Sequence, residues 1–387
     1  MTIPDPRPIR AFLEERHVSL ASEVAAFASR EIAPRPEPRD DDSARKDARA
    51  LLSQVGAAGR LDPIRSQDWR ACCLTREALA AASPLADAVF ALQGLGTLPI
   101  LLSEEENAPM RERWADAAIS GRAMAAFAMT EPEAGSDVAA MGTTARRDGD
   151  SYRLNGAKTL ISNAGIADFY TVFASTDPKA GGKGISCFVV PADTPGFRFV
   201  RPQILSAPHP LGEIAFADCR VPAANRLGEE GRGYALGLRT LDRMRATVGA
   251  AACGMAARAL AEASTHARTR RQFGKPLAEF QLIQEKLARM AIDLTAARLL
   301  VYRSAWEADR GAPRVTLEAA MAKAFATEAA QRIVDDAVQI LGGAGVLVSN
   351  PVDRLYRAVR ALRIYEGTTE IQHLVIAGQL LAQDLDR

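Results

Sequence analysis

The residue pattern of this 387-residue chain changes twice, and these changes limit the folds that it can adopt. Residues 1–123 are rich in Ala, Leu, Glu and Arg, whereas residues 124–230 contain short β-branched or aromatic runs separated by Gly, Pro, Asn and Asp. From residue 231 onward, long helical patterns return. This order predicts an α+β fold with an N-terminal helical domain (1–123), a middle β-barrel or sandwich domain (124–230) and a C-terminal helical bundle domain (231–387).

Local patterns predict the main elements within these domains. Helices are expected over 11–32, 43–59, 76–96, 281–302 and 316–345, and glycines are expected to end those over 76–96 and 316–345. In the middle domain, the alternation of Ile185, Cys187 and Val189 indicates a strand, and Asn155-Gly156 predicts a hairpin turn. No βαβ repeat occurs, so a doubly wound sheet is not expected.

Composition excludes several classes of function. The chain has 48 Lys and Arg against 47 Asp and Glu, so it offers no global field for nucleic acid. No apolar run reaches the ~18 residues of a membrane span, and the N-terminus lacks the apolar region of a secretion signal. Five cysteines without a CxxC pair indicate reduced thiols and a cytoplasmic location, and four scattered histidines predict no metal site.

Two short motifs in the middle domain could bind a cofactor. In "TEPEAGSD" (130–137), small residues around Gly135 and Ser136 would let backbone N–H groups approach an anion, although a plain surface turn has the same composition. In "NGAKTLISNAG" (155–165), the hydroxyl of Ser162 could donate to a ring heteroatom or bond to its own backbone.

Three further motifs lie in the C-terminal domain. "RTRRQFGKPL" (268–277) places arginines beside an aromatic residue, which suits a diphosphate but also a helix end. "QILGGAG" (339–345) lacks the GxGxxG spacing of a nicotinamide site, and the chain has no P-loop. In "RIYEGTTEIQ" (363–372), Glu366 could begin a helix or act as a base in a dry pocket.

Together, the order and spacing of these five motifs resemble those of the acyl-CoA dehydrogenases, from about residue 10 to 385. The resemblance implies a C-terminal four-helix bundle and FAD bound in an extended form. It also implies a homotetramer built as a dimer of dimers, with electron-transferring flavoprotein as the electron acceptor. The implied reaction is α,β-dehydrogenation of an acyl-CoA thioester to the trans-2-enoyl-CoA.

The resemblance also assigns roles to individual residues. Glu366 would be the base that removes the α-proton, while flavin N5 accepts hydride from the β-carbon. The implied FAD contacts are Phe127, Met129, Thr130, Gly135, Ser136, Leu160, Ser162, Arg270, Gln272, Phe273, Gln339, Gly343, Thr368 and Glu370. The implied substrate contacts are Ser136, Leu241, Asp242, Arg245, Tyr365 and Gly367.

Three positions depart from the family pattern, and alternatives stay open. Leu160 stands where many relatives have tryptophan, Ala358 where many have aspartate, and Met244 where some branched-chain members place the base. The same scaffold could oxidise an acyl group bound to a carrier protein, whereas Glu366 argues against nitroalkane oxidation and monooxygenation. A non-catalytic helical scaffold is the alternative from another class. We expect a short to medium or branched acyl group, with residues 85–100 forming the pocket floor.

Overall fold

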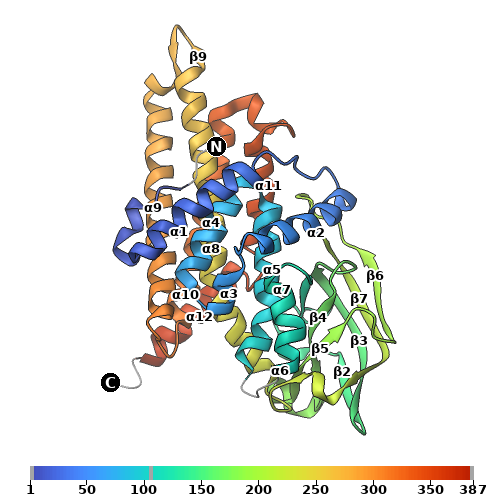
Figure 1. Cartoon of the computed structure of the whole chain (residues 1–387). Coiled ribbons are helices and arrows are strands. Elements are labelled where there is room, and N and C mark those ends of the chain that lie inside the picture. The colour runs from blue at the N-terminus through green and yellow to red at the C-terminus, as the bar shows by residue number, and fades with distance from the viewer. Residues whose placement is uncertain (1–3, 104–107, 384–387) are drawn as a thin grey trace. The chain divides into compact units, whose positions relative to one another are not determined.

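Figure 1 shows the computed structural model, which describes residues 4–103 and 108–383. The chain divides into two compact units. Unit 1 consists of Met1–Glu37, Gln67–Asp87 and Arg245–Arg387, and unit 2 consists of Pro38–Ser66 and Ala88–Met244. The N-terminal residues are thus divided between the two units. The predicted helical, β and helical order is confirmed, whereas the three domain boundaries stay predictions.

Unit 1 is helical. Its elements are α1 (Glu15–Phe27), α4 (Trp69–Ala82), most of α8 (Gly233–Thr269), α9 (Gln281–Asp309), α10 (Thr316–Leu341), α11 (Pro351–Leu362) and α12 (Thr369–Gln383). Helix α10 packs against α9, α11 and α12, and its buried face consists mainly of alanines. Small side chains allow close helix packing, so the one buried lysine of α10, Lys323, stands out.

Unit 2 combines helices with a mixed sheet. Its main helices are α2 (Asp41–Ala57), α3 (Asp62–Ser66), most of α5 (Pro84–Leu102) and α7 (Asp116–Ile119). The strands are β1 (Ala125–Ala128), β2 (Thr144–Asp148), β3 (Ser151–Ser162), β4 (Phe169–Ser175), β5 (Ile185–Pro191), β6 (Phe197–Pro202), β7 (Leu211–Pro222) and β8 (Arg226–Leu227). The sheet has the order β6-β7-β3-β2-β4-β5-β8, and β1 pairs in parallel with β4.

The strands β4 and β5 are buried on both faces. On one face, Phe169, Phe173 and the predicted set Ile185, Cys187 and Val189 join a core that includes Trp114 and Leu236. On the other face, Tyr170, Val172, Phe188 and Val190 pack with residues of β3 and β7. The predicted period of two is present, but neither face is left for solvent, as in a strand sandwiched between two layers.

The predicted hairpin at Asn155-Gly156 is wrong. Strand β3 continues through both residues, with a register shift between Leu154 and Gly156, and the β2–β3 turn lies instead at residues 149–150. Gly156 has φ of 144°, and a Cβ there would lie 2.5 Å from Oγ1 of Thr143. The glycine therefore serves a β-bulge and a close approach, which the same dipeptide also permits.

The prediction that glycines end the helix over 76–96 is also wrong. The chain breaks at Ser83, between α4 and α5, and α5 continues through Gly94 and Gly96 to Leu102. A Cβ on Gly94 would lie 2.7 Å from Cε of Met244, and one on Gly96 would lie 2.6 Å from Cβ of Ala125. These glycines leave room for neighbouring atoms, and they do not end the helix.

Helix α5 also corrects the expectation about membrane spans. By length and composition alone α5 could cross a membrane, so the prediction that no apolar run reaches the length of a membrane span is wrong. However, 83% of its apolar window is buried inside the structure, as expected for a core helix.

Candidate active site

The loop that joins α11 to α12 carries Glu366 in an unusual backbone conformation. Glu366 has φ of 54°, and the following Gly367 has φ of 92°. A non-glycine residue in this left-handed region costs roughly 1–2 kcal/mol, so surrounding contacts must hold it there. Gly367 cannot be replaced easily, because a Cβ would lie 2.4 Å from Nε2 of Gln372. The sequence motif thus corresponds to a strained turn ahead of a helix.

The carboxyl group of Glu366 lies among buried charges of unit 1. Its Oε2 atom is buried and has no hydrogen-bond partner among the described residues. Burial raises the pKa of Glu366, against the lowering effect of the cations Arg76, Lys323 and Arg245. A buried carboxyl with a raised pKa and an unused oxygen has the properties of a general base.

An ion pair lies beside this carboxyl group. Arg76 on α4 is fully buried and donates from Nε and Nη2 to both carboxylate oxygens of Asp87, at 2.8 and 2.9 Å. Its Nη1 donates to Oγ1 of Thr247 at 2.8 Å, and it also hydrogen-bonds to the side chain of Tyr365. Although burial opposes the charged form, Asp87 raises the pKa of Arg76, so the guanidinium stays charged. Sequence analysis identified neither member of this pair.

Three side chains hold the backbone carbonyls of the Glu366 turn. Lys323 Nζ donates to the Gly367 carbonyl oxygen at 2.6 Å, and Gln372 Nε2 donates to the same oxygen at 3.1 Å. Gln372 Nε2 and Arg245 Nε each lie 3.4 Å from the Glu366 carbonyl oxygen. Of these donors, only Arg245 was predicted as a site residue.

In unit 2, a buried ion pair anchors the predicted pyrophosphate loop. Lys158 on β3 bonds to Oε1 of Glu131 at 2.7 Å and to the Met129 carbonyl oxygen at 3.2 Å. The other side of Glu131 accepts from the backbone N–H of Gly142 at 2.6 Å. The pair therefore fixes both ends of the loop that carries Gly135 and Ser136, two residues that are exposed. A Cβ on Gly135 would meet no atom within 4 Å, so the loop leaves open space.

The predicted flavin contacts on β1 and β3 lie close together in this unit. The Thr159 N–H donates to the Thr130 carbonyl oxygen at 3.0 Å, just after β1, and Phe127 packs against Phe173 with the rings tilted by 55° and their centroids 4.9 Å apart. Leu160 sits at a second irregularity of β3, with φ of 56° and a side chain that is 55% exposed. A branched side chain held in this conformation and turned outward indicates a surface for a ligand.

The hydroxyl of Ser162 has a histidine partner that sequence analysis missed. Its Oγ lies 2.8 Å from Nε2 of His209. Burial lowers the pKa of His209 to about 4, and Arg45 adds to this effect, so the imidazole is neutral near pH 7. The motif around Ser162 predicted a hydroxyl at a strand end but contained no signal for its partner, which lies 47 residues away in the chain.

The remaining predicted residues are spread over helix ends. Phe273 is 94% exposed with φ of 50°, in the two-residue turn between β9 (Arg271–Gln272) and β10 (Lys275–Pro276) at the shared end of α8 and α9 (Figure 1). Arg270, Gln272, Gln339, Gly343 and Glu370 are also exposed, and Thr368 accepts from the Ile371 N–H at 3.3 Å. Leu241 and Asp242 are partly buried on the part of α8 that belongs to unit 2. Each has an exposure compatible with its predicted role, and those roles stay predictions.

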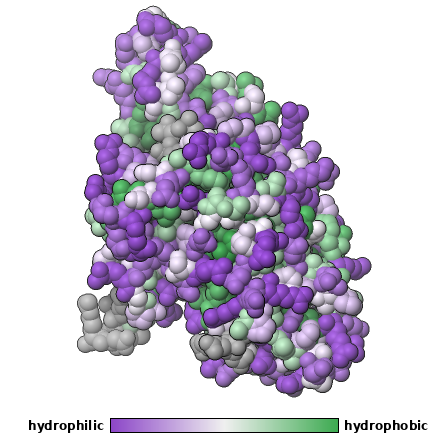
Figure 2. Space-filling view, in the orientation of Figure 1, coloured by the Kyte–Doolittle hydropathy of each residue, from purple (hydrophilic) through white to green (hydrophobic). Residues whose placement is uncertain are grey.

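Much of the visible surface is hydrophilic, with scattered hydrophobic residues (Figure 2). Several large apolar side chains are nevertheless well exposed on unit 1, and they are Phe273, Leu282, Ile292, Val346, Leu347, Val348, Leu374 and Leu381.

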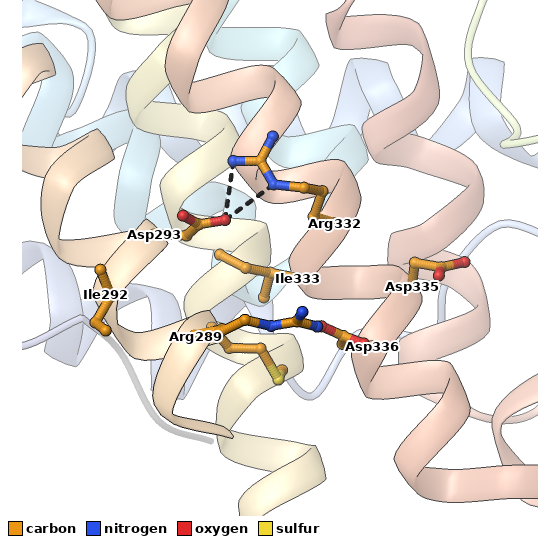
Figure 3. A pocket seen from close by; sticks show the side chains of 8 residues that line it. Arg289, Ile292, Asp293, Arg332, Ile333, Asp335 and Asp336 are labelled. Atoms are coloured by element: carbon orange, nitrogen blue, oxygen red, sulfur yellow. Dashed lines mark hydrogen bonds and ion pairs between the residues drawn. The ribbon is translucent and has the colours of Figure 1, made fainter. Parts of the chain in front are cut away.

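Two other features of unit 1 do not coincide with the predicted site. A surface pocket of about 400 Å³ lies between α9 and α10, and two ion pairs, Arg332–Asp293 and Arg289–Asp336, already join the helices there (Figure 3). The second is a group with metal-ligand chemistry, made of His17, Asp68 and Asp309, which the scattered histidines did not suggest.

The acids of this second group already have cationic partners. Arg16 pairs with Asp68, and Arg70 Nε bonds to Asp309 at 2.6 Å. His17 Nε2 lies 3.1 Å from Asp68, and His17 Nδ1 accepts from the Glu14 N–H. We interpret the group as an ion-pair network that joins α1, α4 and α9.

Comparisons with known proteins identify the family and agree with the fold. Residues 231–381 match the family model for the acyl-CoA dehydrogenase C-terminal domain, and residues 126–219 match the model for the middle domain. The probable acyl-CoA dehydrogenase FadE25 of Mycobacterium tuberculosis is 38% identical over 378 residues, which cover 95% of this chain and 96% of the relative.

Two solved structures show the same fold over nearly the whole chain. Butyryl-CoA dehydrogenase from Megasphaera elsdenii is 34% identical, with a TM-score of 0.88 over 95% of this chain and 99% of that one. A chain from the structural study of the electron-transferring flavoprotein of Acidaminococcus fermentans is 35% identical, with a TM-score of 0.89 over 95% and 98%. The chain therefore belongs to the acyl-CoA dehydrogenase family, whose members are FAD-dependent oxidoreductases.

Proposed function

We propose that this enzyme removes an α-proton and a β-hydride from an acyl-CoA thioester, producing the trans-2-enoyl-CoA, with Glu366 as the base. The observation that carries the proposal is the carboxyl group of Glu366, which has a raised pKa and a buried oxygen without a hydrogen-bond partner. An α-proton of a thioester is weakly acidic, so its removal requires a strong base in a water-poor site.

The surroundings of Glu366 suit this task. Burial increases the affinity of the carboxylate for a proton, while Arg76, Lys323 and Arg245 keep its ionised form accessible. The strained turn fixes the direction of the side chain, which reduces the reorganisation needed before proton transfer. The wall beside the base would be Tyr365, whose side chain is 38% exposed and therefore still accessible to a ligand.

FAD fits the side chains of unit 2. An apolar ring face could rest against the outward Leu160, while Thr130 and Ser162 offer hydroxyls for ring heteroatoms, and the open loop at Gly135 and Ser136 offers space for a pyrophosphate. On unit 1, the exposed residues Arg270, Gln272 and Phe273 are proposed to contact the FAD of a neighbouring subunit, as the family resemblance implies. When bound, FAD supplies the acceptor for the β-hydride.

The thioester carrier and the partners are part of the proposal. We propose CoA as the carrier, because relatives similar over nearly the full length bear acyl-CoA dehydrogenase names. Electron-transferring flavoprotein is proposed as the acceptor, supported by the similar chain from the Acidaminococcus fermentans study. A homotetramer and a cytoplasmic location, together with a short to medium or branched acyl group, stay proposals.

An anaerobic flavin assay tests the function. The purified protein should be yellow, and an acyl-CoA panel should bleach the flavin with at least one short to medium or branched member. Glu366→Gln should retain FAD and bind the same thioester but bleach it several orders of magnitude more slowly. Bleaching of Glu366→Gln at the native rate would refute the assignment of the base, and a colourless protein would favour a non-catalytic scaffold. Faster bleaching by the same acyl group on a carrier protein would favour that carrier over CoA.

A further inference from the structure

The turn that carries the proposed base needs an anchor, and the structure shows where one lies. Glu366 holds a left-handed conformation that is strained for a residue other than glycine, so the turn will relax unless the carbonyl oxygens of Glu366 and Gly367 are held. Both oxygens are bonded to side chains of unit 1, and the shortest of these contacts is the 2.6 Å bond from Lys323 Nζ to the Gly367 oxygen.

Lys323 occupies an unexpected position for a cation. It is fully buried on α10, next to Ala322 and Ala324 and one turn before Thr327. A buried ammonium is unfavourable unless a specific interaction compensates for its lost hydration. The acceptor of Lys323 is a backbone carbonyl of the catalytic turn, and a bond from a charged donor is stronger than one between neutral groups.

We propose that Lys323 is a positioning residue for proton removal: with Gln372, it clamps the backbone after Glu366 and so holds the carboxyl group in its reactive direction. This inference rests on the proposed function of Glu366. Gln372 is also fully buried, and its Nε2 lies within 3.4 Å of both carbonyl oxygens of the turn. Arg245 supports the Glu366 oxygen from α8, at 3.4 Å.

The hydrogen bond from Lys323 should depend on pH, because burial and the neighbouring charged groups set the pKa of Lys323. Burial lowers the pKa of Lys323 to about 8, against the opposing effect of Glu366, while Arg245 lowers it further. Glu328 on α10 and Glu370 on α12 also favour the charged form of Lys323. The ammonium is therefore present near pH 7 and is lost as pH rises through about 8, which replaces a charged donor by a weaker neutral one.

The test uses Lys323→Met in the holoenzyme, with FAD content and substrate affinity measured beside the rate of anaerobic flavin reduction. We expect FAD content and the Kd for acyl-CoA to stay within about twofold, while the reduction rate falls about 10- to 100-fold. We also expect the native rate to fall above pH 8, and this alkaline decline to be absent in Lys323→Met. Lys286→Met is the matched control, because Lys286 pairs with Asp336 in the α9–α10 surface pocket, away from the clamp. Its rate should equal that of the native enzyme.

Several results would overturn the inference. A native reduction rate in Lys323→Met would show that no clamp is needed. A parallel loss of rate, FAD and substrate affinity would indicate a general structural role instead of positioning.

If Lys323→Met does not fold, Gln372→Met and the native enzyme decide the question. A reduction rate in Gln372→Met below that of the native enzyme, with unchanged substrate Kd, together with a native alkaline decline near pH 8, supports the clamp. The absence of either result rejects it. A failure of Glu366→Gln to slow the reaction would instead reject the proposed function itself, so the two failures can be told apart.

Discussion

Replacing Arg76 by methionine should destabilise unit 1 far more than removing an arginine from its surface. Arg76 is fully buried, and the change leaves the carboxylate of Asp87 buried without the two bonds, at 2.8 and 2.9 Å, that now neutralise it. Breaking a buried pair by removing one partner costs roughly 3–5 kcal/mol, because the remaining charge keeps its desolvation penalty. Thr247 also loses a 2.8 Å hydrogen bond.

A double-mutant comparison separates this penalty from lost packing. In Arg76→Met/Asp87→Leu neither charge of this pair remains buried, so most of the lost free energy of unfolding should return, and the double variant should be near neutral. The control is Arg289→Met on α9, whose side chain is 58% exposed and pairs with Glu285 and Asp336. Such an exposed pair contributes about 0–1 kcal/mol.

Denaturant unfolding of the FAD-saturated variants, followed by far-UV circular dichroism, measures these differences. The same variants should change the pH dependence of flavin reduction, because Arg76 lowers the pKa of Glu366. Asp87 has a smaller and opposite effect on the pKa of Glu366, so the acidic limb of the pH profile should still move to higher pH in the double variant. If Arg76→Met cost no more than Arg289→Met, or if adding Asp87→Leu restored no stability, the buried charge of Asp87 would not be the source of the loss.

Three further predictions follow from other contacts. Burial raises the pKa of Glu366, so the rate of flavin reduction should rise with pH with a midpoint above the ordinary glutamate pKa of about 4.3. Stopped-flow pH profiles would measure this midpoint. Leu160→Gly should leave the free energy of unfolding unchanged or raise it by up to ~1 kcal/mol, because glycine adopts the left-handed conformation of this exposed position without strain. The same variant should bind FAD more weakly in an equilibrium titration. Lys158→Met should free the loop anchored by Glu131 and raise the Kd for FAD at least tenfold, whereas the exposed Lys179→Met should leave it unchanged.

The elements with strong periodicity were predictable, and the errors have a common cause. The α9 and α10 helices, the strands of the middle region and the glycine end of α10 follow from local residue patterns. Local patterns predicted that the glycines at positions 94, 96 and 156 mark a helix end or a turn, but in the structure they allow atoms from other segments to approach closely. A local pattern shows that a glycine can adopt unusual backbone angles, but it does not show which atoms elsewhere in the fold leave no room for a Cβ.

Continuous motifs in the sequence were enough to predict the chemical groups of the site, those of Glu366, Ser162 and Gly135. How these groups are held and charged depends on contacts between segments that are far apart in the chain. Arg76, Asp87 and Lys323 come from separate helices, and each looks like an ordinary polar residue within an alanine-rich pattern. Only folding buries them together, and burial is what turns a common glutamate into a carboxyl group with a raised pKa on a strained, clamped turn.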